Sequence, residues 1–416
     1  MSRNRSSVAA WLGRGVLLGA LGLLGTGCAT QSLNQARSQF YSGELTEAEA
    51  SLAERDPPRR DRVLFLMERG TIRQALGEFE SSSEDFIRAF DYLVELERYS
   101  ISRGAGSLLI NDNIRDFVGY PYERTLLHAM TAHNHFSIGN WDNAAIEARR
   151  IIASLAEDNR GNFPDEPYSR YLAGLALELI DDPSNAALQY RLADEAAAHL
   201  NIDADTGRIS YAPPPAPDSN ETNETERVEQ IWPQPRSEPA HQQPPDWTHE
   251  LVVGLQFGRA PGDTGRLGHR GGAQPGIYAE IYIDGQYAGR TYPLTDIAYL
   301  RAETERIRAL RDAARAITRI VIKEGIAQAV ESKNDAWAGD LVRFILFGLL
   351  EQPDTRRWET LPRWFHIGRV HAPADLDRYT VKVKTAQGRT LRTFEVENPM
   401  HRRRQQWVSF HRDLGR

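Results

Sequence analysis

The spacing of apolar residues changes along the chain and predicts several kinds of segment. A short apolar run at residues 16–24 is followed by residues 31–200, where apolar side chains recur at the spacing of amphipathic helices. Residues 202–247 are polar and rich in proline, and such a composition buries too little apolar surface to fold. From residue 248 onwards the period switches to two, which is typical of β-strands. We therefore expect a helical part and a strand-rich part joined by a linker.

The helical part contains a pattern that recurs four times. A turn residue is followed after five positions by a small residue and after nine by a larger or apolar one; three copies add an apolar residue at the twelfth. The turn residue would end one helix in a left-handed conformation, and the small residue would let the next helix approach closely. The copies are Gly43/Ala48/Leu52, Gly77/Ser82/Phe86/Ala89, Gly139/Ala144/Ala148/Ile151 and Asp181/Ala186/Tyr190/Ala193, and helices before three of the turns are expected at residues 62–76, 122–138 and 169–180.

This pattern resembles the tetratricopeptide repeat. Gly43 and Gly77 are 34 residues apart, the period of that repeat, whereas the later intervals require insertions. The resemblance implies stacked helical hairpins whose concave side binds a peptide or a partner protein. An irregular helical bundle is the alternative.

The strand-rich part is predicted to be an antiparallel α+β domain. Strands are expected at residues 250–257, 364–370, 379–385 and 390–396, with a hairpin at 277–292 that turns at Asp284-Gly285. Residues 295–332 are expected to be mostly helical, and the apolar residues 337–350 form a core helix too short to span a membrane. The fold class is thus multidomain, with all-α tetratricopeptide-like repeats followed by an antiparallel α+β domain. The expected boundaries are 1–27 for a signal peptide, 28–201 for the repeats, 202–247 for a disordered linker, 248–400 for the α+β domain and 401–416 for a basic tail.

The N-terminus has the layout of an export signal, with three arginines and no acid before the short apolar run. The segment Leu24-Gly25-Thr26-Gly27-Cys28 resembles the lipobox of bacterial lipoproteins, although Gly25 stands where that family prefers leucine. The resemblance implies cleavage before Cys28 and its acylation, with several acyl chains giving stable anchoring. Ala29 in place of aspartate implies outer-membrane sorting and a chain that faces the periplasm. A plain cleaved signal peptide and an uncleaved anchor are the alternatives.

Composition and missing motifs narrow the classes of function. Because Cys28 is the only cysteine, the chain has no internal disulfide and no cysteine-based zinc site. The net charge of −7 argues against a general nucleic-acid binder. Neither Gly-x-Ser-x-Gly, His-Glu-x-x-His nor a P-loop motif occurs. We therefore expect no catalytic activity, no cofactor, no metal and no nucleic-acid partner.

Four segments together resemble a family of bacterial lipoproteins with N-terminal tetratricopeptide-like repeats and a C-terminal β-rich domain. They are residues 122–128, 143–150, 311–323 and 354–362, and their order spans most of the mature chain. The resemblance implies no established reaction. It implies an association with cell-envelope assembly, near lipoprotein activators of peptidoglycan synthases.

Two groups of residues are candidates for contact with a partner or ligand. Beside Trp358, a pair of Asp354 and Arg357 would bind a ligand by stacking and charge; alternatively the pair fixes a turn while the tryptophan fills the core. On a repeat helix, charged side chains would contact a partner in the groove or form a charged helix face. This second group is Glu147, Arg149 and Arg150.

The expected function is a lipid-anchored cell-envelope scaffold or adaptor. It would bind another envelope protein or peptide through its helical repeats and support peptidoglycan or envelope assembly. The alternatives are an envelope enzyme or a small-ligand-binding module that acts through the C-terminal domain. The enzyme would need paired catalytic groups, such as Asp354 with His366 or His371 in one deep pocket.

Overall fold

The computed structural model describes residues 31–53, 59–103, 116–212, 244–260, 276–311, 356–397 and 400–415. Cys28, Asp354, the expected core helix at 337–350 and most of the expected linker lie outside these ranges. In the part of the chain that the structure describes, no helix is long and apolar enough to cross a membrane.

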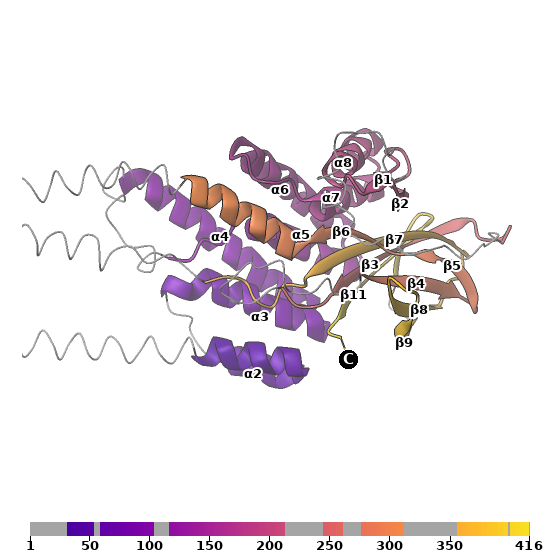
Figure 1. Ribbon diagram of the computed structural model, residues 1–416, viewed down its shortest axis with the longest axis horizontal. Coiled ribbons are helices and arrows are strands. Elements are labelled where there is room, and N and C mark those ends of the chain that lie inside the picture. The colour runs from indigo at the N-terminus through magenta and orange to yellow at the C-terminus, as the bar shows by residue number, and fades with distance from the viewer. Residues whose placement is uncertain are drawn as a thin grey trace, which may run out of the picture.

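The helices follow one another as antiparallel hairpins (Figure 1). Residues 31–42 are helical and pair with α2 (Leu45–Ala53). A short 3-10 helix, η1 (Arg59–Asp61), leads into α3 (Arg62–Leu76) and α4 (Phe79–Arg103), and α5 (Pro121–Ser137) pairs with α6 (Trp141–Arg160). The last hairpin is α7 (Pro167–Leu179) with α8 (Pro183–Ala196). The expected helix at 62–76 is confirmed at both ends, and the other two are confirmed to within two residues.

The four expected turn residues adopt the conformation that the pattern predicted. Gly43, Gly77, Gly139 and Asp181 have φ angles of 74°, 81°, 69° and 73°, in the left-handed region. Each ends the first helix of a hairpin, as a C-terminal capping residue does. The residues five and nine positions later are all buried. The pattern therefore specifies the tight turn and the contact between the two helices of each hairpin.

A further small residue belongs to this pattern, seven positions before each turn. Gly70 of α3 lies against the ring of Phe86, and Gly174 of α7 lies against the ring of Tyr190. A Cβ atom on either glycine would come within 2.5 or 2.7 Å of a ring carbon. The other two hairpins have the alanines Ala36 and Ala132 at this position. Small residues on the first helix thus make room for the larger residue on the second.

The strands form two main sheets beyond a small hairpin of β1 (Leu200–Ile202) and β2 (Ile209–Tyr211). One sheet has five strands in the order β10-β11-β3-β7-β6, and the other has four in the order β5-β4-β8-β9. The bounds are β3 (His249–Phe257), β4 (Ile277–Ile283), β5 (Gln286–Arg290), β6 (Tyr292–Asp296), β7 (Trp364–Ala372), β8 (Arg378–Thr385), β9 (Thr390–Glu397), β10 (His401–Arg403) and β11 (Gln406–Asp413). Residues 297–311, within the expected helix, are helical after β6.

The expected strands and the hairpin at Asp284-Gly285 are confirmed, but two expectations about the sheet are wrong. The domain is not wholly antiparallel, because β11 runs parallel to β3. Residues 401–413, expected as part of a basic tail, are instead β10 and β11 of the five-stranded sheet. The arginines at 402–404 sit around the turn of this hairpin, while Val408 and Phe410 are buried against the helices. The strand at 406–413 was not predicted because the run of arginines before it is typical of a solvated surface segment.

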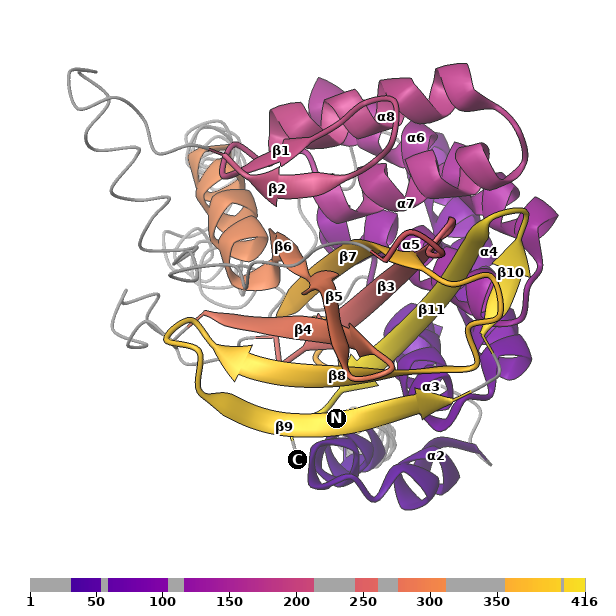
Figure 2. The same cartoon turned by 90° about the vertical axis from the view of Figure 1, so that its right-hand side faces the viewer.

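The five-stranded sheet is the middle of three layers, between the helices and the four-stranded sheet (Figures 1 and 2). Along β3, Val252 belongs to the core shared with the helices, whereas Leu251, Val253 and Leu255 belong to the core between the two sheets. Successive side chains of a strand point to opposite faces, so both faces of β3 are covered. This is why its sequence is almost continuously apolar.

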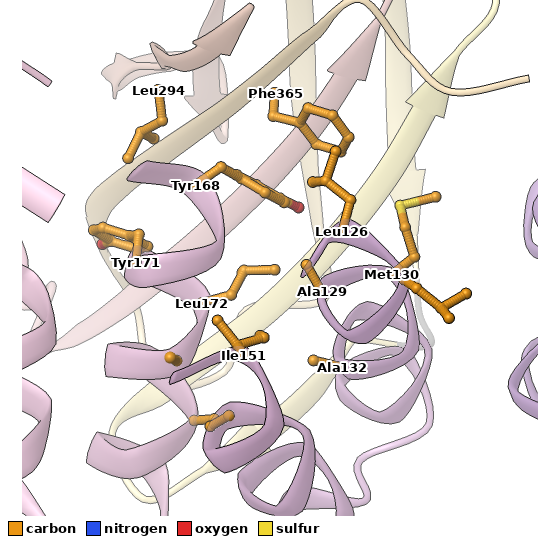
Figure 3. Close-up of a cluster of buried hydrophobic side chains, with 14 of the residues drawn as sticks. Leu126, Ala129, Met130, Ala132, Ile151, Tyr168, Tyr171, Leu172, Leu294 and Phe365 are labelled. Atoms are coloured by element: carbon orange, nitrogen blue, oxygen red, sulfur yellow. The ribbon is translucent and has the colours of Figure 1, made fainter. Parts of the chain in front are cut away.

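The middle sheet packs against α5 and α7 of the helical part. The ring of Tyr168 lies 4.5 Å from that of Phe365, and the ring of Phe136 lies 5.4 Å from that of Phe410 (Figure 3 shows Tyr168 and Phe365). Every residue from Pro121 to Phe136 except Arg124 is buried. The helical part and the strand-rich part, which were expected as separate domains joined by a linker, therefore share one core.

Candidate functional site

The candidate group on the repeat helix is mostly engaged within its own hairpin. Glu147 of α6 is 2% exposed; it bonds His128 Nδ1 of α5 at 2.8 Å and accepts a hydrogen bond from Arg150 Nη1 at 2.7 Å. The Arg150 guanidinium also lies 5.2 Å from the ring centre of Phe90. Arg149 is exposed. These residues link α5, α6 and α4, and among the three candidates the exposed one is Arg149.

The described residues of the other candidate group are buried between the helices and the sheet. Trp358 is 1% exposed, its ring centre lies 5.7 Å from that of Phe86, and its indole N–H donates to Thr71 Oγ1 at 2.9 Å. Arg357 is 7% exposed, and its main-chain oxygen accepts from Arg37 Nη2 at 3.1 Å. Asp354, their expected companion, lies outside the described residues. This geometry fits the role of Trp358 as a core residue.

Two buried glutamates hold this segment, and the motif search did not single them out. Glu68 of α3 accepts hydrogen bonds from the main-chain N–H groups of Glu359 and Thr360, at 2.9 and 3.1 Å, and from Arg37. Glu123 of α5 accepts from the N–H of Trp358 at 2.8 Å. Burial raises the pKa of Glu123 to about 7, against the lowering effect of its hydrogen bonds. In the sequence, the available sign of this role was the acidic residue Glu68 within an apolar run, because a buried acid needs a hydrogen-bond partner inside the protein.

The histidines required by the enzymatic alternative do not share a described pocket. His366 is 1% exposed between the sheets, and burial lowers its pKa to about 3. His371 lies at the other end of β7, near Arg208. Among the described residues, no group of three or more histidines, cysteines or acids is arranged to hold a metal ion.

A pocket of about 690 Å³ lies where β9, β11 and the first hairpins come together. Its walls are Gly43, Leu45, residues 74–77 and Phe79 of the helical part, and residues 392–394 and 410–414 of the C-terminal part. His133 of α5 also lines it. The volume is within the range of ligand-binding pockets. Because both halves of the chain contribute walls, the pocket exists only in the packed molecule.

One wall of this pocket is the edge of β11, which is only partly paired with another strand. β10 pairs with β11 only through residues 406–408, and no described strand pairs with residues 409–413 on that side. The Gln405 carbonyl accepts from the Glu250 N–H of β3 at 2.8 Å. Main-chain groups of successive residues point to opposite sides of a strand, so those of 407, 409, 411 and 413 face β3. The N–H and C=O groups of Phe410 and Arg412 therefore point away from β3, at the open edge.

The side chains around this edge carry little charge except for one cation. Burial lowers the pKa of His133 to about 3 and that of His411 to about 4, so both are neutral at pH 7. Arg392 is paired with Asp413. Arg412 donates from Nη2 to the Gly258 carbonyl at 2.9 Å, and its guanidinium lies 5.9 Å from the ring centre of Phe40; neither residue lines the pocket. Burial lowers its pKa to about 10, which leaves it protonated.

The His133 side chain is oriented by the sheet. Gln256 Nε2 of β3 lies 2.9 Å from His133 Nδ1, and the ring of His133 lies 4.6 Å from that of Phe410. An amide N–H donated to Nδ1 places the proton of the neutral ring on Nε2. The Phe410 ring takes this position because Gly254, its neighbour on β3, has no side chain; a Cβ there would lie 2.2 Å from the ring. Gly254 thus leaves room for the ring of Phe410, which lines the pocket.

The basic run has contacts within the molecule. Arg403 Nε donates to the Leu179 carbonyl at 3.3 Å, and Arg404 pairs with Asp181 at 2.7 Å. Arg402 lies over the ring of Trp407. The β10–β11 turn therefore rests on the α7–α8 turn.

Compared with protein-family models and with curated proteins, the chain matches none. The candidate site of this chain is therefore argued from its geometry alone. The sequence search found neither the pocket nor Arg412, because the walls are contributed by five segments that are distant in the sequence.

Proposed function

We propose that this chain is a lipid-anchored cell-envelope adaptor that holds another envelope protein. In this proposal Cys28 is acylated, the anchor is in the outer membrane, and the folded chain faces the periplasm. The signal-like N-terminus and the lipobox resemblance support the anchor. The left-handed turns and the small residues that recur in each hairpin support tetratricopeptide-like stacking, an architecture that serves protein binding.

The observation that carries the proposal is the pocket between the first hairpins and the sheets. The chain's own sheet packs on α5 and α7 of the helical part and covers them. The pocket is open beside this packed region, and it offers main-chain groups and apolar surface together. We therefore assign partner binding to the pocket and not to a concave repeat groove.

The position of Cys28 would keep this body close to the membrane. The described part of the chain begins at residue 31, three residues after Cys28, and is helical there. Three residues span at most about 10 Å when fully extended. In an anchored molecule residue 31 would thus lie close to the membrane surface, and the pocket would lie beside Gly43 and Leu45, beyond the other end of the helical residues 31–42.

The anchor is tested by replacing Cys28 with serine in the full chain. We expect palmitate labelling to be lost and the protein to move from the membrane fraction to the soluble fraction, because no thiol remains for acylation. Thr26→Ser, two residues away, keeps the thiol and serves as the matched control. Labelling that persists in the Cys28→Ser protein would show that the anchor assignment is wrong.

Partner binding is tested by formaldehyde crosslinking in native membranes, followed by purification of the full chain. We expect one envelope protein to be recovered in a fixed ratio, and to be recovered at least tenfold less with Ala75→Trp. The tryptophan would add bulk at a half-buried position of α3 that lines the pocket. Glu395→Trp, at an exposed position of β9 outside the pocket, is the control. Recovery of no envelope protein above background would overturn the adaptor function.

A further inference from the structure

We propose that the end of the molecule at which the helical residues 31–42 begin is a membrane-contact surface that lies against a bilayer containing anionic phospholipid. The inference rests on the lipid anchor of the proposed function and goes beyond it, because it assigns one face of the folded body to the membrane. We name this surface the anchor end; it consists of residues 59–62, 116–120, 161–163 and 306–311.

The anchor end lies opposite the pocket. The helical residues 31–42 and α3 both end at the pocket, which Gly43 and Gly77 line. The two helices run side by side, with Arg37 paired to Glu68 at 2.6 Å. At 1.5 Å per residue, both helices begin about 20 Å away from the pocket. The start of the first helix, which an acylated cysteine would hold at the membrane, is therefore at the anchor end.

Segments from distant parts of the sequence meet at the anchor end. The Arg60 carbonyl, just before α3, accepts from the Phe117 N–H at 2.9 Å. The helix of residues 297–311 ends on the same surface, because Arg308 Nη2 donates to the Gly119 carbonyl at 3.2 Å. Figure 1 shows this helix and α4 extending away from the strands toward the same side. The anchor end is thus one continuous surface at the far side from the strands.

Two large apolar side chains stand in solvent at the anchor end. Leu310 is 63% exposed and Val118 is 45% exposed, the two highest values among the exposed large apolar residues of the described chain. They come from adjoining segments, since Arg308 bonds the main chain next to Val118. Exposed apolar side chains beside cations are typical of a surface that enters the boundary between headgroups and acyl chains.

The cations beside these apolar residues favour an anionic surface. Arg308 and Arg311 each donate to a main-chain carbonyl of a neighbouring loop, and each guanidinium lies 4.3 or 4.5 Å from the centre of an aromatic ring. A carbonyl carries no net charge, so these bonds orient the arginines without neutralising them. Glu305, an acid of the same helix, already pairs with Arg301 at 2.7 Å. Phospholipid phosphates attract arginines held in this way.

The anchor decides between a bilayer and a protein as the occupant of this end. The stretch between an acylated Cys28 and residue 31 spans at most about 10 Å. A small protein domain is about 30 Å across, so none fits between residue 31 and the bilayer. The membrane itself would therefore face the anchor end, while the pocket on the opposite side stays open to a partner.

The test uses the lipidated full chain with one introduced cysteine that carries a fluorophore. Because Cys28 is the only natural cysteine and its thiol would carry lipid, the introduced thiol is the one that reacts. Leu310→Cys reports on the anchor end. Leu391→Cys of β9 and Ile146→Cys of α6, at positions 37% and 44% exposed, are the matched controls on the sheet and on the outer helices.

The readout is quenching of the fluorophore by vesicle lipids that carry a spin label on the headgroup. In vesicles of phosphatidylcholine with about 30% phosphatidylglycerol, we expect quenching at residue 310 to exceed that at residues 391 and 146 about threefold. A body that tumbles freely on its anchor would give equal quenching at the three positions. A body that lies on another side would give stronger quenching at a control position, and either result would overturn the inference.

A lipid change and a second variant test the charged and apolar contributions. Vesicles of phosphatidylcholine alone should reduce the quenching at residue 310 about twofold, because the arginines lose their anionic partner. In the mixed vesicles, Val118→Glu should reduce it about twofold as well, since a carboxylate opposes insertion and repels phosphate. Leu188→Glu, at a 37% exposed leucine of α8, is the control and should change nothing. Quenching that is insensitive to both changes would contradict a contact of this chemistry.

Palmitate labelling of the same preparations separates this inference from the anchor. A labelled chain with equal quenching at all three positions leaves the anchor standing and shows that the membrane-contact surface is wrong. A chain without palmitate would overturn both the anchor and the surface that depends on it.

Discussion

Replacing Trp358 with alanine is expected to lower the free energy of unfolding by about 3–5 kcal/mol. The indole is 1% exposed and packs on Phe86 of α4, and it also donates to Thr71 of α3. The variant would leave a cavity in the core that joins the helices to the sheet. Chemical denaturation followed by circular dichroism measures the loss.

A conservative change separates the two contributions of Trp358. Trp358→Phe keeps an aromatic ring but removes the N–H donor, so the loss should be smaller and should include about 1 kcal/mol for the hydrogen bond. Trp407→Ala, at a half-buried tryptophan of β11, is the control for a general effect of losing an indole. A loss below about 1 kcal/mol for Trp358→Ala would contradict its place in the core.

The second large effect is expected from Arg369→Ala, which should also cost about 3–5 kcal/mol. The Arg369 side chain is 2% exposed and pairs with Glu178 of α7 at 2.6 Å and with Glu250 of β3 at 2.7 Å. Its removal leaves two largely buried carboxylates without their shared cation. Breaking a buried pair is costly for this reason, even where forming it gained little.

Arg208 supplies a matched control, because it binds the same Glu250 at 2.7 Å but is 45% exposed. Solvent screens such a pair, so Arg208→Ala should change stability by no more than about 1 kcal/mol. Equal losses in the two variants would show that the burial of Arg369 has no energetic role.

The Arg369 cluster also predicts a dependence on pH. Burial alone would raise the pKa of Glu178 and Glu250, but hydrogen bonds and charge attraction from Arg369 outweigh it, so both pKa values are lowered. For an acid with a lowered pKa, the stabilisation is complete above the ordinary value of about 4.3 and is lost as pH falls through the lowered pKa. The part of acid destabilisation that these two groups contribute should be absent in Arg369→Ala.

Local features of the fold could be predicted from the sequence, because their causes lie within a few residues. Gly77 ends a helix through its own conformation, and the Asp284-Gly285 turn closes a hairpin of adjacent strands. The small residues at Gly70 and Gly174 were equally visible, since they recur seven positions before each turn. The conformation at these positions can therefore be predicted from the neighbouring residues alone.

The pairing of β11 with β3 could not be predicted in the same way. The two strands lie about 150 residues apart, and their register depends on contacts such as Phe410 against Gly254 and His133. The residues before β11 are arginines and a glutamine, which are typical of a surface. The candidate site shared this difficulty, because its main-chain groups have no sequence signature and its walls come from segments that are distant in the sequence.

The place of β11 has a consequence for the order in which the molecule is made. Ribosomes synthesise the chain from its N-terminus, so the helices are complete while the strand that covers α5 is still missing. Until residues 406–413 appear, Phe136 and its neighbours on α5 lack the ring of Phe410 that covers them in the finished molecule. The chain therefore passes through a stage in which apolar side chains of α5 are exposed to solvent and can bind other molecules. A nascent chain that ends before β11 should for this reason be a target for chaperones and proteases.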